Sequence, residues 1–331
     1  MKRGSVLRRV PAAQAMRLAE QSGLEGDVCV FELAADAAPI TMEAVTGRAL
    51  MVAPGDRFLG TAGYRESTRW VVGNIPEGGL VPGCNYWVLA DCGVVGEFQG
   101  ESPREKGHLG RVRFLGTMRG EGGDTLNIRQ FVQRLGAEAC VDHGAPAFLV
   151  VGTSSEVGKT TAAINVLRAL RRSGRTHVVA LKATGTSSVT ELHSYQDFGA
   201  TPCFDSVDFG LPTTYPSGRD GIDEHFTTML DVCLAIPADA VLIECGGDIL
   251  GANVPSFLAR LAKRRPDVRV ILAASDALAA FGAKSVLADM GLTIALITGP
   301  CTDTPTIQQR TRDLCGLPAL NMVGAAPAAL F

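Results

Sequence analysis

The sequence predicts an α/β protein, in which a parallel β-sheet covered by helices on both faces is preceded by a smaller β-rich domain. From residue 147 onward, near-continuous apolar runs alternate with segments of helical length, a pattern typical of parallel strands buried on both faces. Residues 26–118 instead hold short runs rich in Val, Phe, Tyr and Trp, broken by Gly and Pro. Such runs predict the strands of a small barrel or sandwich.

Four segments follow from these patterns: an N-terminal arm (1–25), the β-rich domain (26–118), a linker with a helix (119–146) and the α/β domain (147–331). The arm is basic but has no apolar stretch of signal-peptide length, so we expect a short surface helix and a cytoplasmic protein. No run in the sequence approaches the ~18 apolar residues of a membrane helix.

The elements of the α/β domain are predicted from its apolar runs and the stretches between them. The strand candidates are AFLVV, HVVAL, DAVLIE, VRVILAA, TIALIT and PALNMV. The helix candidates are residues 159–173, 189–198, 221–235, 255–264, 276–290 and 304–314. Ligands of parallel sheets bind beyond the carboxyl ends of the strands, and polar segments follow the strands here: GTSSEVGKTT, KATGTSS, ECGGD, SDA and TGPCTDT.

Composition narrows the choice of partners. The net charge of −3 shows no basic excess, so we expect a small-molecule substrate and neither nucleic acid nor a membrane as partner. The nine cysteines form no CxxC pair, which indicates buried reduced thiols and supports neither a zinc site nor disulfides. His108, His143 and His193 have no metal-ligand spacing. The sequence leaves the oligomeric state open, with a homodimer as the candidate assembly.

The segment FLVVGTSSEVGKTTAAINVLRAL places a Gly-rich loop between an apolar strand and an amphipathic helix. Backbone N–H groups of such a loop, opening onto a helix N-terminus, form a cradle for phosphate. In this motif Lys159 reaches the terminal phosphates and the Thr160 hydroxyl ligates Mg²⁺. The candidate cofactor-binding residues of the loop are Gly152, Thr153, Ser154, Ser155, Val157, Gly158, Lys159, Thr160 and Thr161.

The loop resembles that of dethiobiotin synthetase and the related cobyrinate amidating ligases, which also place the first Gly one residue further from Gly-Lys than the common phosphate loop does. The resemblance implies a P-loop NTPase-like fold and an enzyme dependent on ATP and Mg²⁺. It assigns Lys182, which follows VVAL, to the substrate and the transferred phosphate, and Glu244, in AVLIECGGD, to Mg²⁺. Lys159, Lys182 and Glu244 are therefore the candidate catalytic residues.

Physical arguments agree with both assignments. A cation beside Lys159 would neutralise charge that spreads over phosphoryl oxygens. A carboxylate after four apolar strand residues is costly to bury without a partner. Two departures are informative: Ser154 stands where related regulatory ATPases carry a lysine, which disfavours a switch ATPase, and Cys245 replaces a Gly of the ligase pattern, which is expected to narrow the pocket.

A second resemblance covers the same region. LKATGTSS and FDSVDFGLPTTYP are similar, in their order after the loop, to the P-loop family that includes bacterial D-glutamate N-acetyltransferases. This resemblance implies acetyl-CoA, whose pyrophosphate suits the same cradle. The N-terminal half of that family is Rossmann-like, whereas residues 26–118 here are predicted to be β-rich. Both resemblances cover only residues 147–325.

Further candidates lie in the polar segments after the other strands. Asp205 and Asp208 could approach one Mg²⁺, so the candidate metal ligands are Thr160, Asp205 and Glu244. GLPTTYPSGRDG is a predicted substrate or lid loop. The candidate substrate-binding residues are Thr184, Thr186, Asp208, Thr213 and Thr214.

Three further polar segments have less specific predicted roles: the segment after TIALIT, GYREST and SPREKGHLG. Thr298 and Asp303 are candidates for contact with a nucleotide base. GYREST (63–68) and SPREKGHLG (102–110) are expected to be solvated turns, with a contribution to a substrate carboxylate site as the alternative.

Three functions of different classes remain open. The first is an ATP- and Mg²⁺-dependent ligase or kinase-like enzyme that activates a small carboxylate or amine. The second is an acetyl-CoA-dependent N-acyltransferase that acts on a small amino acid and uses the loop as a pyrophosphate clamp. The third is a nucleotide-binding regulatory module whose β-rich domain recruits a partner. Glu244 and the Asp pair favour the first, whereas KATGT and VDF favour the second.

Overall fold

A computed structural model of the chain describes residues 1–67, 69–103, 110–133 and 141–323. The chain divides into two compact units. Unit 1 consists of Met1–Gln133, Thr186–Thr190 and Asp205–Pro216, and unit 2 consists of Arg134–Gly185, Glu191–Phe204 and Ser217–Phe331. Two short segments that the sequence assigned to the α/β domain therefore belong to the β-rich unit.

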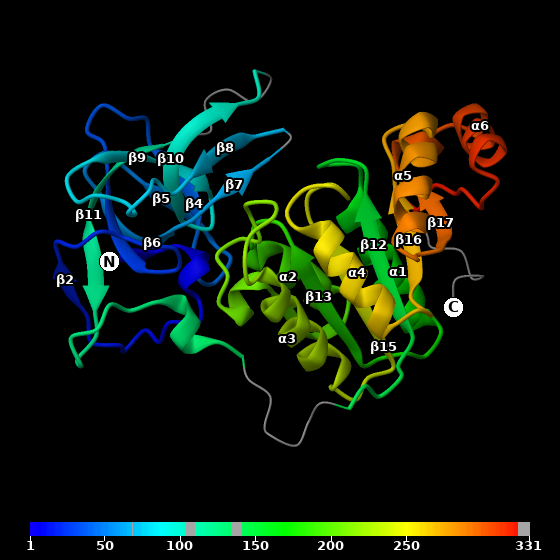
Figure 1. Ribbon diagram of the computed structural model, residues 1–331, viewed down its shortest axis with the longest axis horizontal. Helices are drawn as coiled ribbons and strands as arrows, with labels where there is room; N and C mark the ends of the chain where they lie inside the picture. The colour runs from blue at the N-terminus through cyan, green and yellow to red at the C-terminus, as the bar shows by residue number, and fades with distance from the viewer. Residues whose placement is uncertain (68, 104–109, 134–140, 324–331) are drawn as a thin grey trace. The chain divides into compact units, whose positions relative to one another are not determined.

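The main sheet of unit 1 comprises β1 (Lys2–Arg3), β2 (Arg17–Ala19), β3 (Val28–Leu33), β6 (Arg57–Ala62), β7 (Arg65–Glu66), β8 (Val71–Asn74), β9 (Asn85–Ala90), β10 (Val94–Glu101) and β11 (Arg111–Arg119) (Figure 1). A separate hairpin pairs β4 (Ile40–Glu43) with β5 (Ala49–Val52). The strand order is β1-β6-β3-β11-β9-β10-β8-β7, with β2 on β11. An additional pairing of β6 with β10 closes β6, β3, β11, β9 and β10 into a ring, so this part of the sheet is a small barrel.

Both faces of the barrel strands are buried, as β3 shows. Successive side chains of a strand point to opposite faces, and Val28 and Val30 lie in one apolar cluster while Phe31 lies in another. The ring centroid of Phe31 is 5.6 Å from that of Phe58 and 5.5 Å from that of Phe114. Three strands of the ring are thus joined by aromatic packing.

The first 25 residues do not form the surface helix expected from the sequence. They contribute β1, the 3-10 helix η1 (Ser5–Leu7) and β2 to unit 1. Val6, Leu7 and Val10 are buried in its core. Core packing and strand pairing therefore override the local helical preference of this segment.

Unit 2 contains the strands β12 (Ala147–Gly152), β13 (Val178–Thr184), β14 (Ala200–Asp205), β15 (Ala240–Cys245), β16 (Arg269–Ala273) and β17 (Ile294–Thr298). Its helices are α1 (Lys159–Arg172), α2 (Val189–Asp197), α3 (Ile222–Leu234), α4 (Val254–Arg264), α5 (Ala277–Asp289) and α6 (Pro305–Cys315). All six predicted helices are confirmed, each with ends within one residue of those expected. Among the described residues, no helix has the length and apolar character needed to cross a membrane.

The strands of unit 2 form a six-stranded sheet in the order β14-β13-β15-β12-β16-β17. The pairs β13–β15, β15–β12, β12–β16 and β16–β17 are parallel. α1 and α2 pack on one face through a shared apolar cluster, and α3 and α4 cover the other (Figure 1). The rings of Phe226 in α3 and Phe257 in α4 meet edge to face. The predicted fold class is confirmed.

One strand prediction was wrong, and one strand was missed. PALNMV is not a strand, because only Ala319 forms a bridge, to Ile297 of β17. β14 was not among the predicted strands, because its sequence, ATPCFD, contains no continuous apolar run. In the linker, the 3-10 helix η2 (Ile128–Phe131) is present. Residues 134–140 of the linker, for which a helix without stated bounds was predicted, fall outside the described residues, as do residues 104–109 and 68 of the two polar turns.

Candidate functional site

The phosphate loop joins β12 to α1 and requires glycine at both of its ends. Gly158, the N-cap of α1, has a φ of 88°, a left-handed conformation that glycine adopts without steric cost. A Cβ on Gly152 would lie 2.8 Å from Val157 Cγ2 and 2.9 Å from Lys159 Cδ. Because the Lys159 side chain folds back over Gly152, a larger residue there would displace it.

Lys159 is held inside this loop. Its side chain is buried, and its Nζ donates a hydrogen bond of 2.8 Å to Ser154 O. Burial lowers the pKa of Lys159, the neighbouring Lys182 lowers it further, and the Glu244 carboxylate opposes both effects. The ammonium group thus lies among the other two candidate catalytic side chains, and its hydrogen bond to a backbone oxygen is one that a phosphate oxygen can replace.

Glu244 lies at the carboxyl end of β15, between the loop strand and the strand of Lys182. In the register of the sheet it pairs with Val150 of β12 on one side and with Lys182 of β13 on the other. The buried carboxylate accepts a hydrogen bond of 3.0 Å from Thr160 Oγ1 at its Oε1 atom. The predicted neighbours Thr160 and Glu244 are therefore in direct contact.

Lys182 is brought to the same edge by the close approach of two backbones. A Cβ on Gly246 would lie 2.4 Å from Thr184 O and 3.2 Å from Lys182 Cε. Gly246 N donates to Thr184 O at 3.1 Å, and Thr184 Oγ1 donates to Gly246 O at 3.0 Å. Gly246 thus lets the ends of β13 and β15 lie side by side and leaves room for the aliphatic part of the Lys182 side chain.

Two residues of the site were missed from the sequence, and both lie on α2. Glu191 forms an ion pair with Lys182, and the Tyr195 hydroxyl donates a hydrogen bond of 2.6 Å to Glu244 Oε2. The spacing of four residues places both on one face of the helix. The four-residue spacing of Glu191 and Tyr195 could be read from the sequence, but the sequence did not show which strands α2 packs against.

The other loop residues have structural contacts as well. Thr153 N donates to Ala273 O, and Thr153 Oγ1 accepts a hydrogen bond of 3.2 Å from Ser275 N. Val157 is buried and Thr161 is exposed. The loop is thus anchored to the end of β16 and the segment that follows it.

Of the two candidates for a base contact, Thr298 is the last residue of β17 and Asp303 follows the strand. Thr298 is buried, and its Oγ1 accepts a hydrogen bond of 3.1 Å from Met322 N. Asp303 is exposed and accepts one of 3.0 Å from Asn321 Nδ2. Both side chains bind the segment after α6, and a role in base recognition stays a prediction.

The predicted lid loop has a different position from that expected. Of the candidate substrate-binding residues, only Thr184 belongs to unit 2, whereas Thr186, Asp208, Thr213 and Thr214 belong to unit 1. Thr213 and Thr214 are fully buried, and Thr213 Oγ1 donates to Tyr64 O at 3.0 Å. The first half of GLPTTYPSGRDG is therefore a buried part of unit 1, where the Thr213 hydroxyl has its partner, and it is not an exposed lid.

Asp205 and Asp208 are used inside unit 1. Arg8 Nη2 lies 2.6 Å from Asp205 Oδ1 and 2.7 Å from Asp208 Oδ2, and Arg9 Nε lies 2.5 Å from Asp208 Oδ1. The two aspartates also form a reciprocal capping box around the 3-10 helix η3 (Ser206–Phe209). Their carboxylates neutralise arginines, a role that the sequence did not suggest for the expected metal ligand Asp205.

Thr160 and Glu244 suit a magnesium ion that also binds a ligand's phosphates. Mg²⁺ takes oxygen ligands and is commonly held by one or two protein groups plus substrate phosphates. The hydroxyl and carboxylate oxygens of these two residues converge within 3.0 Å. Among the described residues, no group of three or more His, Cys, Asp or Glu side chains could hold a metal alone.

Cys245 is a free, buried thiol beside the site. Burial raises its pKa to about 12, against the effect of a hydrogen bond with Thr184. The thiol is therefore protonated at neutral pH and chemically inert. Of the other cysteines described, Cys84 is exposed and Cys203 is partly buried.

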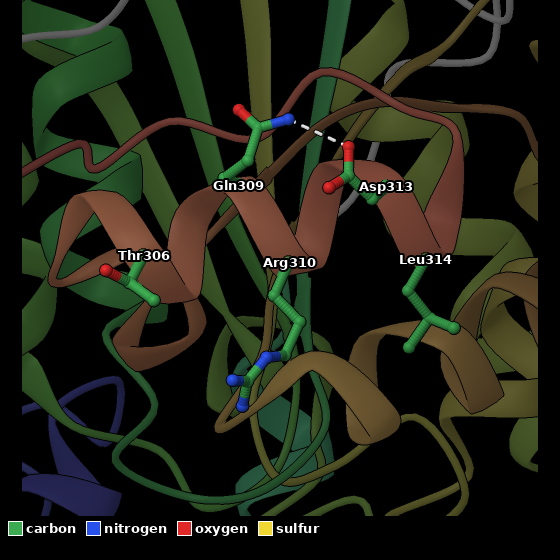
Figure 2. Close-up of a pocket in the computed structure, with 5 residues that line it drawn as sticks. All are labelled: Thr306, Gln309, Arg310, Asp313 and Leu314. Atoms are coloured by element: carbon green, nitrogen blue, oxygen red, sulfur yellow. Dashed lines mark hydrogen bonds between the residues drawn. The ribbon is translucent and has the colours of Figure 1, made fainter.

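Unit 2 also has an open hollow that contains none of the candidate site residues. It is lined by Thr306, Gln309, Arg310, Asp313 and Leu314, all on the outer face of α6 (Figure 2). Gln309 Nε2 donates to Asp313 Oδ1 at 2.8 Å. No residue of the phosphate loop contributes to this hollow, so it is not the candidate site.

Fold and site together define an α/β protein in which a Gly-rich loop with the sequence of a phosphate loop follows a central parallel strand, β12. No protein-family model matches the chain, and no curated protein matches it. Among solved structures it is similar to the signal recognition particle receptor FtsY from Elizabethkingia anophelis, with 18% identity and a TM-score of 0.36 over 57% of this chain. The match spans 62% of that receptor chain. A similarity of this extent carries no argument about function.

Proposed function

We propose that the chain is an ATP- and Mg²⁺-dependent enzyme that activates a small carboxylate or amine by phosphoryl transfer. One observation carries the proposal: the Thr160 hydroxyl contacts the Glu244 carboxylate where the buried lysines Lys159 and Lys182 also converge. A site for phosphate alone needs cations and amides, whereas a hydroxyl and a carboxylate at the same point favour a metal-bound nucleotide.

Each residue of the site has a separate proposed role, which follows from its position. Lys159 would exchange Ser154 O for a terminal phosphate oxygen, while the loop amides bind the preceding phosphates. Lys182, on the adjacent strand, would counter the charge that develops on the transferred group. Thr160 and Glu244 would hold Mg²⁺, which supplies further neutralisation of phosphate charge. The class of substrate rests on the resemblance of the loop to dethiobiotin synthetase.

Ligand-induced thermal stabilisation tests the proposal, with ATP·Mg²⁺ compared against acetyl-CoA. A ligand at 100 times its Kd adds about 2.7 kcal/mol to the free energy of unfolding. We expect stabilisation by ATP·Mg²⁺, its loss in Lys159→Ala, and its retention in Lys263→Ala, which removes an exposed lysine of α4. Stabilisation by acetyl-CoA alone would assign the loop to the pyrophosphate of an acyl donor and contradict the proposal.

A further inference from the structure

Tyr195 connects the apolar core of unit 2 to the candidate metal ligand. Its side chain is 1% exposed and belongs to the cluster formed by α1, α2 and the sheet. A buried tyrosine hydroxyl needs a hydrogen-bond partner, and here it donates to Glu244 Oε2 at 2.6 Å. The ring is fixed by packing, so the position of the donor is fixed as well.

Both oxygens of Glu244 therefore have a hydroxyl donor. Thr160 donates to Oε1 and Tyr195 donates to Oε2. The two donors come from different helices, α1 and α2. A carboxylate held at both oxygens cannot rotate about its terminal bond without losing one hydrogen bond, so its plane is set before any ligand arrives.

We propose that Tyr195 is a positioning residue that orients Glu244 for a divalent cation bound together with nucleotide. This inference rests on the proposed function, because it assigns Glu244 to Mg²⁺. Partners that orient metal ligands typically contribute 10–100-fold to metal affinity. Tyr195 touches neither nucleotide nor reacting atoms in this proposal and acts through Glu244 alone.

Tyr195→Phe isolates this role, because it keeps the ring and its packing and removes only the hydroxyl. We expect the Mg²⁺ concentration that gives half-maximal enhancement of ATP binding, measured by calorimetry, to rise by ~10–100-fold. ATP affinity in the presence of EDTA should stay within about twofold of the unmodified protein, since Lys159 and the loop amides are unchanged.

Tyr86→Phe is the matched control. Tyr86 is also buried, and its hydroxyl accepts a hydrogen bond of 2.8 Å from Val81 N, but it lies in the core of unit 1. Tyr86→Phe should therefore leave the Mg²⁺ dependence of ATP binding unchanged. In a Glu244→Gln background, Tyr195→Phe should have no additional effect on Mg²⁺, because the carboxylate through which it acts is absent.

The possible failures can be told apart. If the unmodified protein binds ATP with no dependence on Mg²⁺, the proposed function is wrong and the inference fails with it. If Mg²⁺ enhances binding equally in the unmodified protein and in Tyr195→Phe, only the role of Tyr195 is overturned. Should Tyr195→Phe not fold, Tyr195→Met takes its place, because it also removes the hydroxyl and keeps an apolar side chain. A raised Mg²⁺ requirement in that variant supports the role of Tyr195, and an unchanged requirement overturns it.

Discussion

Lys182 and Glu191 form an ion pair at the carboxyl end of β13. The side chain of Lys182 is 9% exposed and that of Glu191 is 32% exposed, and the Glu191 oxygen of the pair, Oε2, is buried. Glu191 is the counter-charge of Lys182. Under the proposed function, a phosphoryl group or substrate carboxylate would compete with Glu191 for this ammonium group.

Glu191→Gln should strengthen ATP binding measured without Mg²⁺. The substitution removes the competing charge, and a partly exposed ion pair contributes up to ~1 kcal/mol, so we expect Kd to fall by up to ~5-fold. Glu224→Gln, on the first turn of α3, is a control for the change in net charge. An unchanged or raised Kd in Glu191→Gln would show that Glu191 does not compete with the ligand.

Lys182→Met should lower kcat by ~10²–10³-fold, the scale for loss of one preorganised group that stabilises charge in the transition state. ATP affinity should change much less, because Lys159 and the loop amides remain. Steady-state kinetics separates the alternatives. A rise in KM with kcat nearly constant would indicate that Lys182 only tethers substrate.

Gly246→Ala should both destabilise unit 2 and weaken ATP binding. The new Cβ would lie 2.4 Å from a backbone oxygen, Thr184 O, so the ends of β13 and β15 must separate, and overpacking of this kind costs ~1–3 kcal/mol. Gly282→Ala is the control, since a Cβ there meets no atom within 4 Å. In α5 that change should stabilise by ~0.5–1 kcal/mol. Urea unfolding of both variants measures the difference.

Arg8→Met should destabilise unit 1 by ~3–5 kcal/mol, because it leaves the buried Asp205 carboxylate without its arginine, while Asp208 keeps only Arg9. Burial alone lowers the pKa of Arg8, but the adjacent Asp205 and Asp208 outweigh it and raise the pKa. The triple variant Arg8→Met, Asp205→Asn, Asp208→Asn should recover part of the loss. A triple variant less stable than Arg8→Met would show that the aspartates matter through their capping hydrogen bonds instead.

The stability that Asp27 contributes to unit 1 should decrease as pH rises through the acidic range. Burial raises the pKa of Asp27 above its ordinary value of 3.8, against hydrogen bonds from Asn127 and Leu24. Between 3.8 and the raised pKa the folded state binds more protons than the unfolded state, so stability falls with pH. The stability difference between the unmodified protein and Asp27→Asn should therefore decrease over that window in urea unfolding. A difference that stays constant with pH would contradict the raised pKa of Asp27.

Local signals in the sequence determined the elements of unit 2 and its phosphate loop. Apolar runs of four or more residues marked five of its strands, and glycine at 152 and 158 marked the turn that only a residue without Cβ can make. These signals are local because hydrophobic periodicity and backbone conformation depend on neighbours in the chain. Where the local signal was weak, as in β14 and the first 25 residues, the predictions failed.

Only the tertiary structure decided which side chains meet. The position of β15 between β12 and β13 brings Glu244 to both Thr160 and Lys182, and the packing of α2 adds Glu191 and Tyr195. The pairing of Arg8 with Asp205 joins residues 197 positions apart. Such contacts depend on strand order and on which face of the sheet each helix covers. These are set by burial over the whole chain, so the sequence could indicate a phosphate site without showing how its carboxylate is held.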